Sequence, residues 1–280
     1  MSAFRGYGAA DVDTPAQAIA NHDNVEDQPL LGGAKMPSRV PALRRKMLED
    51  VNREHGDIVL LLGYVITGLL DSASNFVWGS FVSMQTGNTV YIGLGLAAPR
   101  ESTRWIKSGV SLGSFCLGAF IFSRVHRHFS PRRRGVLAAS FTLQLMLCLG
   151  AGAILALAPS ASGDAEDISW NVLVPIALLA FQSCGQTVTS RALGYNALTS
   201  VVLTSIYTDL FSDAHLFGLR NVERNRRVAA PLLLLLGAVT GGIFAHSDIG
   251  IAGAVWLASA LKLLIVVSWL FWPADSTHSS

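Results

Sequence analysis

Charged residues are scarce in this sequence. Only 14% of its 280 residues are Asp, Glu, Lys or Arg, whereas soluble domains carry about 25%. Cysteine is scarcer still: the three cysteines lie in separate apolar stretches and form no Cys-x-x-Cys pair, which argues against a disulfide framework or a cysteine-based zinc site. No His-Glu-x-x-His, P-loop or Gly-x-Gly-x-x-Gly motif occurs. We therefore expect no metal, no cofactor and no enzymatic activity.

Apolar residues, by contrast, make up 51% of the chain, and the charges between residues 57 and 272 fall almost entirely in short loops. This distribution is typical of a multi-pass integral membrane protein. We expect an all-α transmembrane domain over residues 55–272 that contacts the lipid bilayer and binds no nucleic acid. The expected location is the plasma membrane or a vacuolar or endosomal membrane, and homo-oligomer formation is left open.

The two ends of the chain are polar. Residues 1–54 lack the apolar core of a signal peptide and are predicted to form a disordered cytoplasmic tail. Within this tail, Glu-Asp-Gln-Pro-Leu-Leu at residues 26–31 resembles an acidic dileucine sorting signal, with a chance match as the alternative. Residues 273–280 are predicted to form a short polar tail.

Six long apolar runs and two semi-polar segments fill the membrane domain. The semi-polar segments, 79–97 and 196–213, carry amides and hydroxyls that need hydrogen-bond partners in hydrocarbon. Glycines in the first segment also weaken it as a helix. Such backbone is tolerated at membrane depth where protein buries it or where it lines a wet cavity. We predict a helix bundle of six full spans plus two re-entrant or broken segments, with eight full spans as the alternative.

The placement of positive charge favours the six-span arrangement. With the N-terminus in the cytoplasm, six spans place ten Lys and Arg residues in cytoplasmic loops and three outside, whereas eight spans place seven inside and six outside. Lys and Arg are enriched in the cytoplasmic loops of membrane proteins. The ten cytoplasmic residues lie in two loops, Arg124 to Arg134 and Arg191 to Arg227.

The two halves of the membrane domain, 55–158 and 169–272, are interpreted as repeats. Thr86 and Thr204 occupy corresponding places in the two semi-polar segments, and Leu-Gly-Ala follows each segment, at 117–119 and 236–238. Three spans per half is an odd number, so the second half would be inverted relative to the first. The two semi-polar segments could then meet near the midplane, as in many transporters.

Polar and ionisable residues at membrane depth are candidates for a solute or ion site. Asp71, Asp209 and Lys262 are ionisable. A pairing of Lys262 with either aspartate would make a site for a coupling ion or proton, and a snorkelling or ion-paired lysine is the alternative. For Asp71 the alternative is a hydrogen-bond acceptor near the membrane interface. The other candidates offer amides and hydroxyls, whose alternative role is hydrogen bonding between helices. They are Gln85, Thr86, Asn88, Thr204 and Tyr207. The glycines predicted to serve helix packing are Gly113, Gly118, Gly237, Gly241 and Gly242.

The first semi-polar segment carries a combination of motifs. Gly68-x-x-Asp71 precedes Phe81-x-x-x-Gln85-Thr86-Gly87-Asn88, and Gly93 follows. This combination resembles the YoaK-like family of polytopic membrane proteins, defined by a domain of unknown function numbered 1275. The resemblance covers about residues 55–272 and implies a multi-pass membrane protein, but it implies no substrate. The family usually has another Thr-Gly in its second half, whereas Thr204 is followed here by Ser205.

Two functions are compatible with these features. The first is a secondary transporter or facilitator of a small polar solute, with its site at the interface between the repeats. The second is a non-transporting membrane scaffold or regulator that binds lipid or a partner protein through its arginine-rich loops and its tail.

Overall fold

The computed structural model describes residues 42–52, 54–158, 166–195, 198–218 and 220–275, so the predicted sorting signal at 26–31 lies outside the described residues. The described residues contain helices and no named strand, which confirms the predicted all-α class. In chain order the helices are α1 (Ala42–Leu48), α2 (Gly56–Trp78), α3 (Gln85–Ala97), α4 (Arg104–His128), α5 (Arg134–Leu157), α6 (Trp170–Ala192), α7 (Thr204–Phe211), α8 (Val222–Ala245) and α9 (Gly250–Phe271).

Six of these helices are long and apolar enough to cross a membrane, namely α2, α4, α5, α6, α8 and α9. Each has 22 to 25 residues, or at least about 33 Å of helix at about 1.5 Å per residue, and the hydrocarbon core is about 30 Å thick. Helix α3 has 13 residues and α7 has 8, which is too short to cross. The six-span prediction is therefore confirmed, and the eight-span alternative is wrong.

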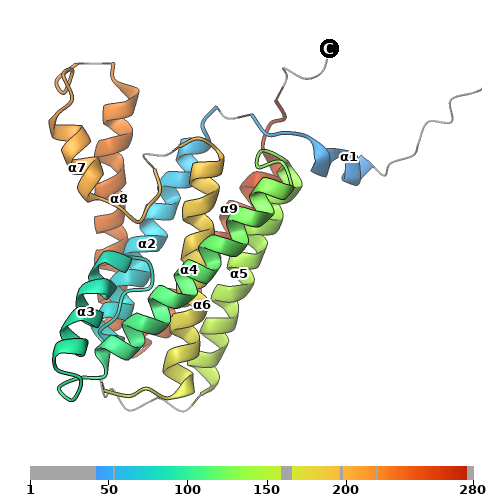
Figure 1. Ribbon diagram of the computed structural model, residues 1–280. Helices are drawn as coiled ribbons and strands as arrows, with labels where there is room; N and C mark the ends of the chain where they lie inside the picture. Colours follow the sequence, from blue (N-terminus) through green and yellow to red (C-terminus); the bar gives the residue numbers. More distant parts are fainter. Residues whose placement is uncertain (1–41, 53, 159–165, 196–197, 219, 276–280) are drawn as a thin grey trace, which may run out of the picture. The chain divides into compact units, whose positions relative to one another are not determined.

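Each semi-polar segment consists of a non-helical stretch followed by one of the short helices. Residues 79–84 lead into α3, and the described residues 198–203 lead into α7. Helix α3 packs against α4 and α7 packs against α8. Figure 1 shows the two short helices at opposite ends of the bundle. Both segments are therefore broken, as predicted from the polar content of both and the glycines of the first.

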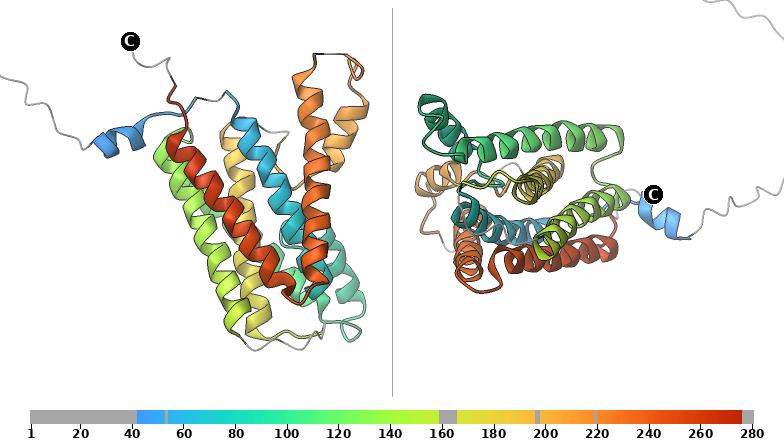
Figure 2. Two further views of the ribbon diagram at one scale, coloured as in Figure 1. Left: turned by 180° about the vertical axis from the view of Figure 1, so that it is seen from behind. Right: turned by 90° about the horizontal axis from the view of Figure 1, so that it is seen from below.

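The spans pack in pairs: α2 lies against α8, α4 against α6, and α5 against both α6 and α9 (Figure 2). The α2–α8 pair approaches most closely through glycine. A Cβ atom on Gly68 would lie 2.0 Å from the backbone oxygen of Leu234, and one on Gly237 would lie 2.1 Å from that of Val65. Small residues allow such backbone contact, which holds helices together where lipid supplies no hydrophobic driving force.

The packing role predicted for five glycines is confirmed for three of them. Gly237 and Gly241 face α2, and a Cβ on Gly118 would lie 2.8 Å from the backbone oxygen of Phe181 on α6. A Cβ on Gly113 or Gly242, however, would meet no atom within 4 Å. The prediction is wrong for these two, because each points away from the neighbouring helix.

The outer helices turn large apolar side chains away from the bundle, as a bilayer-facing surface requires. On α8 these exposed side chains are Leu232, Leu235, Leu236, Val239 and Ile243. In water, a contiguous surface of this kind would be unusual. Contact with the lipid bilayer covers it instead, as predicted from composition.

The described end of the predicted tail contacts the membrane domain. Residues 42–48 form α1, and Asp50 and Val51 form isolated antiparallel bridges with Arg133 and Ala274. Arg134, which starts α5, is buried and forms a 2.9 Å ion pair with Glu49. The reason is a long-range ion pair: Arg134, expected in a loop, binds Glu49 and so connects residues just before α2 to the start of α5.

Candidate functional site

Asp71 holds the non-helical stretch 79–84 inside the bundle. One oxygen of its carboxylate accepts the backbone N–H groups of Val82 (2.9 Å) and Ser83 (2.8 Å), and the other accepts the Ser83 hydroxyl. These backbone groups have no helical partner, and unpaired N–H groups at membrane depth are costly. Asp71 therefore satisfies the turn that lets the chain re-enter the bundle after α2.

Asn88 fixes the other end of the same stretch. Its fully buried amide donates to the Phe81 carbonyl (2.8 Å) and to Ser111 Oγ on α4 (3.0 Å). Its oxygen accepts from the Phe81 N–H (3.0 Å) and from Ser80 Oγ (3.2 Å). With every amide position engaged by protein, Asn88 positions the loop, and its side chain has no group left for a solute.

Ser111 lies within Gly109-Val110-Ser111-Leu112-Gly113, which has the letters of a hydrolase nucleophile elbow, Gly-x-Ser-x-Gly. That elbow requires a sharp strand-to-helix turn that exposes the serine. Here the five residues lie in the interior of α4, and buried Ser111 donates to the Phe81 carbonyl at 2.7 Å. Ser111 is thus a further support of the 79–84 stretch.

The second semi-polar segment is held by α6. Gln186 Nε2 donates to Ser200 Oγ (2.6 Å), and Ser190 Oγ donates to the Leu198 carbonyl (2.7 Å). Thr187 Oγ1 donates to the Thr199 carbonyl. Ser200 is buried and has a φ of 61°. A serine in the left-handed region is uncommon, and residues held in this way cluster at functional sites.

Lys262 is buried and forms hydrogen bonds to two glutamines instead of pairing with an aspartate. Its ammonium group donates to the side-chain oxygens of Gln144 (2.6 Å) and Gln186 (2.8 Å). The predicted pairing is not formed, because the Asp71 carboxylate faces the 79–84 stretch and Asp209 is exposed on α7. Amide oxygens from α5 and α6 stabilise the buried cation in place of a carboxylate.

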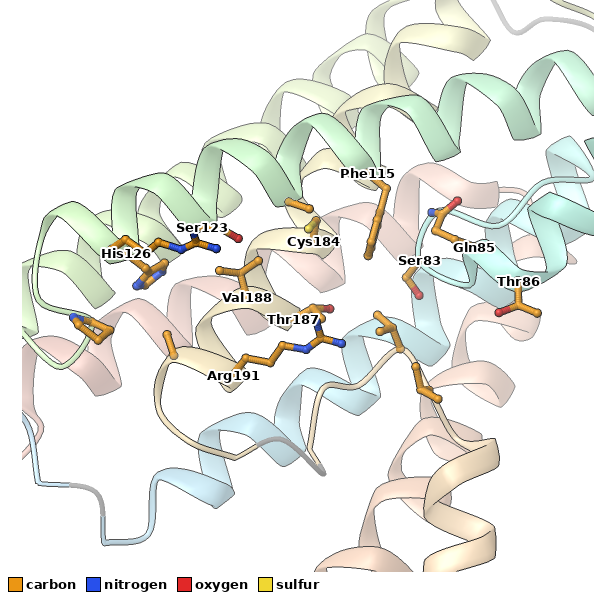
Figure 3. A pocket seen from close by; sticks show the side chains of 16 residues that line it. Ser83, Gln85, Thr86, Phe115, Ser123, His126, Cys184, Thr187, Val188 and Arg191 are labelled. Carbon is orange, nitrogen blue, oxygen red and sulfur yellow. The ribbon is translucent and has the colours of Figure 1, made fainter.

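Two cavities adjoin these supports. The first, here called the α4–α6 cavity, has a volume of about 720 Å³ and extends from Gln85 and Thr86 to the ends of α4 and α6 (Figure 3). The second, here called the half-helix cavity, has a volume of about 490 Å³ and lies between the beginnings of α3 and α7. The residues that line both cavities are Ser83, Thr86, Val201 and Val202.

Half of the predicted site residues line these cavities. Asp71, Thr86 and Thr204 line the half-helix cavity, and Gln85 and Thr86 line the α4–α6 cavity. Neither threonine hydroxyl has a hydrogen-bond partner among the described residues. Both hydroxyls are therefore available to a solute.

The other predicted residues lie elsewhere. Tyr207 lines an apolar groove between α7 and α8, and Asp209 lines neither cavity. Asn88 and Lys262 are buried and line neither cavity. Lys262 reaches the half-helix cavity indirectly, because Gln186 also donates to Thr67 Oγ1 (3.2 Å), which lines it.

Sequence reasoning missed several supporting residues. Ser183 on α6 donates to the Val82 carbonyl (3.0 Å), and Gln144 and Gln186 surround Lys262. His126, at the end of α4, lines the α4–α6 cavity. A glutamine inside an otherwise apolar span was the available signal, since uncharged amides in hydrocarbon also need partners.

Two residues that fix the 79–84 stretch, Asp71 and Asn88, also belong to the motif that gave the sequence its resemblance. The family model described as "Protein of unknown function (DUF1275)" matches residues 59–268. The chain belongs to the DUF1275 family. This match extends from α2 to α9 and so takes in all six spans of the DUF1275 domain. No curated protein and no solved structure matches the chain.

Proposed function

We propose that this DUF1275 protein is a secondary transporter or facilitator of a small polar solute, which it binds in the half-helix cavity. One observation carries the proposal: the beginnings of both short helices line the same cavity, with Thr86 from α3 and Thr204 from α7. Non-helical backbone next to a half-helix, placed at the middle of a bundle, is how many transporters build a solute site. A scaffold has no need of such a cavity.

The order of helices supports a repeat. Helices α2 to α5 run long, short, long, long, and α6 to α9 run in the same order. The packing contacts follow the same correspondence, in which α2, α4 and α5 match α6, α8 and α9. Helix α2 packs against α8 and α4 packs against α6, while α5 packs against its counterpart α9. An inverted repeat with two states of similar energy is a common basis for alternating access.

The α4–α6 cavity supplies a route to the site. It begins at Thr86, beside the half-helix cavity, and reaches Pro131 in the arginine-rich loop after α4. The positive-inside rule favours a cytoplasmic position for that loop, so we expect this cavity to open toward the cytoplasm. The stretch 79–84, fastened by Asp71, lies across the opposite end of the route.

Removal of one free hydroxyl tests the site. Thr86→Val and Thr204→Val keep the shape of the side chain, and we expect each to reduce solute flux in proteoliposomes about five- to tenfold, the value of one lost hydrogen bond. Thr89→Val is the matched control, because the Thr89 hydroxyl bonds the Gln85 carbonyl of its own helix (2.8 Å) and lines neither cavity. A panel of small polar solutes serves as the probe.

Normal flux in both threonine variants would place the site elsewhere. If no solute in the panel moves through the wild-type protein, the scaffold or regulator function is favoured instead.

The direction of the cavity gives a separate prediction on topology. In a cysteine-free background, Arg132→Cys lies in the loop at the cavity mouth and Glu101→Cys lies in the loop between α3 and α4; both positions are exposed. We expect a membrane-impermeant thiol reagent, applied to intact cells, to label position 101 and to spare position 132 until the membrane is opened. Labelling in the opposite order would reverse the orientation.

A further inference from the structure

Three nitrogen-bearing side chains gather at the end of the α4–α6 cavity that lies away from Thr86. They are His126 and Arg127 of α4 and Arg191 of α6. No Asp or Glu is among the described residues that line this cavity. Neither arginine has an ion pair or hydrogen bond to another described side chain. Two unpaired guanidinium groups in a cleft produce a strongly positive local potential.

His126 adds a buried group with an unused nitrogen. Its side chain is only 4% exposed, and Nδ1 has no hydrogen-bond partner among the described residues. Nε2 lies 3.3 Å from Thr189 Oγ1, which itself donates to the Gly185 carbonyl at 2.8 Å. The threonine proton is thereby used, so Nε2 must carry the hydrogen of that contact. Nδ1 is left without a hydrogen-bond partner among the described residues.

We propose that His126, Arg127 and Arg191 form an entry site for the transported solute on its route to the half-helix cavity, and that this solute is a small oxoanion such as a carboxylate, sulfate or phosphate. This inference rests on the proposed transport function and specifies its solute. The arginines supply charge-assisted N–H donors, which suit the oxygen atoms of such groups. Figure 3 shows His126 on α4 and Arg191 on α6, with the Arg191 side chain extended toward Thr187, so both helices contribute nitrogen groups to the cavity wall.

The tautomer of His126 links anion binding to a proton. With hydrogen on Nε2 alone, Nδ1 presents a lone pair, which repels an oxoanion. A second proton, on Nδ1, makes the ring cationic, and this positive charge attracts an anion in the cavity that His126 lines. The other titratable or charged groups in the cavity wall are Arg127 from α4 and Cys184 and Arg191 from α6; α3 contributes only uncharged Gln85 and Thr86. Anion binding therefore takes up one proton.

The same chemistry could come from a soluble anion or from a lipid headgroup, because the cavity mouth lies near the membrane surface. Two probes separate these sources. Sulfate represents the soluble anion and a water-soluble short-chain phosphatidylglycerol represents the headgroup. Both keep a constant charge between pH 6 and pH 8, so any pH dependence belongs to the protein.

The experiment measures the affinity of the purified full chain for each probe by calorimetry at constant ionic strength. We expect wild type to bind at least one probe, and to bind it about fivefold or more tightly at pH 6 than at pH 8. Arg191→Gln and Arg127→Gln should each weaken binding by at least about tenfold. Arg124→Gln is the matched control and should bind as wild type, since Arg124 stacks on Phe120 and does not line the cavity.

A further variant tests the proton. His126→Gln keeps an N–H donor and does not titrate, so it should retain binding within about threefold and lose the pH dependence. Binding of sulfate alone assigns the site to a soluble anion, and binding of the short-chain lipid alone assigns it to a headgroup. Failure of both probes to bind wild type, or unchanged binding in both cavity-arginine variants, would overturn the proposal.

These outcomes are separable from those of the transport test. If Thr86→Val impairs flux of a neutral solute while no anion binds, the anion site is wrong and transport stands. If sulfate binds through Arg191 while no solute crosses the membrane, the anion site stands and transport is wrong.

Discussion

Gly241→Ala is expected to destabilise the protein by at least about 3 kcal/mol, because it forces apart the closest pair of spans. The new Cβ would lie 2.2 Å from the backbone oxygen of Leu69 and equally close to Ser72 Oγ. Backbone on α2 cannot rotate away as a flexible side chain could, so the two helices must separate. Overpacking usually costs about 1–3 kcal/mol and occasionally more, and this contact is with rigid backbone. Thermal unfolding of the purified protein in detergent measures the effect.

The neighbouring residue supplies a control of the same chemical change. A Cβ on Gly242 would meet no atom within 4 Å. Gly242→Ala should be neutral or slightly stabilising, because alanine favours a helix by about 1 kcal/mol over glycine. Equal loss of stability in both variants would show that the glycines act through helix flexibility and not through the α2–α8 contact.

The sequence was sufficient to predict the spans and the two broken segments. Long apolar runs, loop arginines and the glycines around Gln85-Thr86-Gly87-Asn88 each report on local physics: hydrocarbon thickness, the charge bias across the membrane and helix propensity. Thr86 and Thr204 could be matched because they occupy similar places in two similar segments. These features depend on few long-range contacts.

The partners of buried polar groups could not be predicted in the same way. Which side chain faces Lys262 depends on how α5, α6 and α9 rotate and cross, and apolar runs of similar length do not specify these angles. The charge of Lys262 suggested a carboxylate, yet two glutamine oxygens provide its hydrogen bonds. The predicted packing role of Gly242 was wrong for the same reason. Helical spacing predicts which residues share a face, but it does not predict which face contacts another helix.

Asp71 gives the second large prediction, and the structure favours the alternative role of a hydrogen-bond acceptor, which here anchors the loop. Asp71→Ala leaves the N–H groups of Val82 and Ser83 and the Ser83 hydroxyl without their acceptor. Each buried unsatisfied group costs about 1–3 kcal/mol, so we expect a total loss of at least about 3 kcal/mol. Because Ser83 lines both cavities, flux should also be lost.

Two further variants separate anchoring from solute binding. Asp71→Asn keeps an oxygen that can accept the two backbone N–H groups, so it should lose markedly less stability than Asp71→Ala and retain part of the flux. Asp209→Ala changes an exposed aspartate without an ion pair to any described residue and should alter stability by less than about 0.5 kcal/mol. The decisive comparison is unfolding temperature against flux. If Asp71→Ala unfolds at the wild-type temperature yet carries no solute, the carboxylate contacts the solute itself, and Asn88, Ser111 and Ser183 suffice to hold the loop.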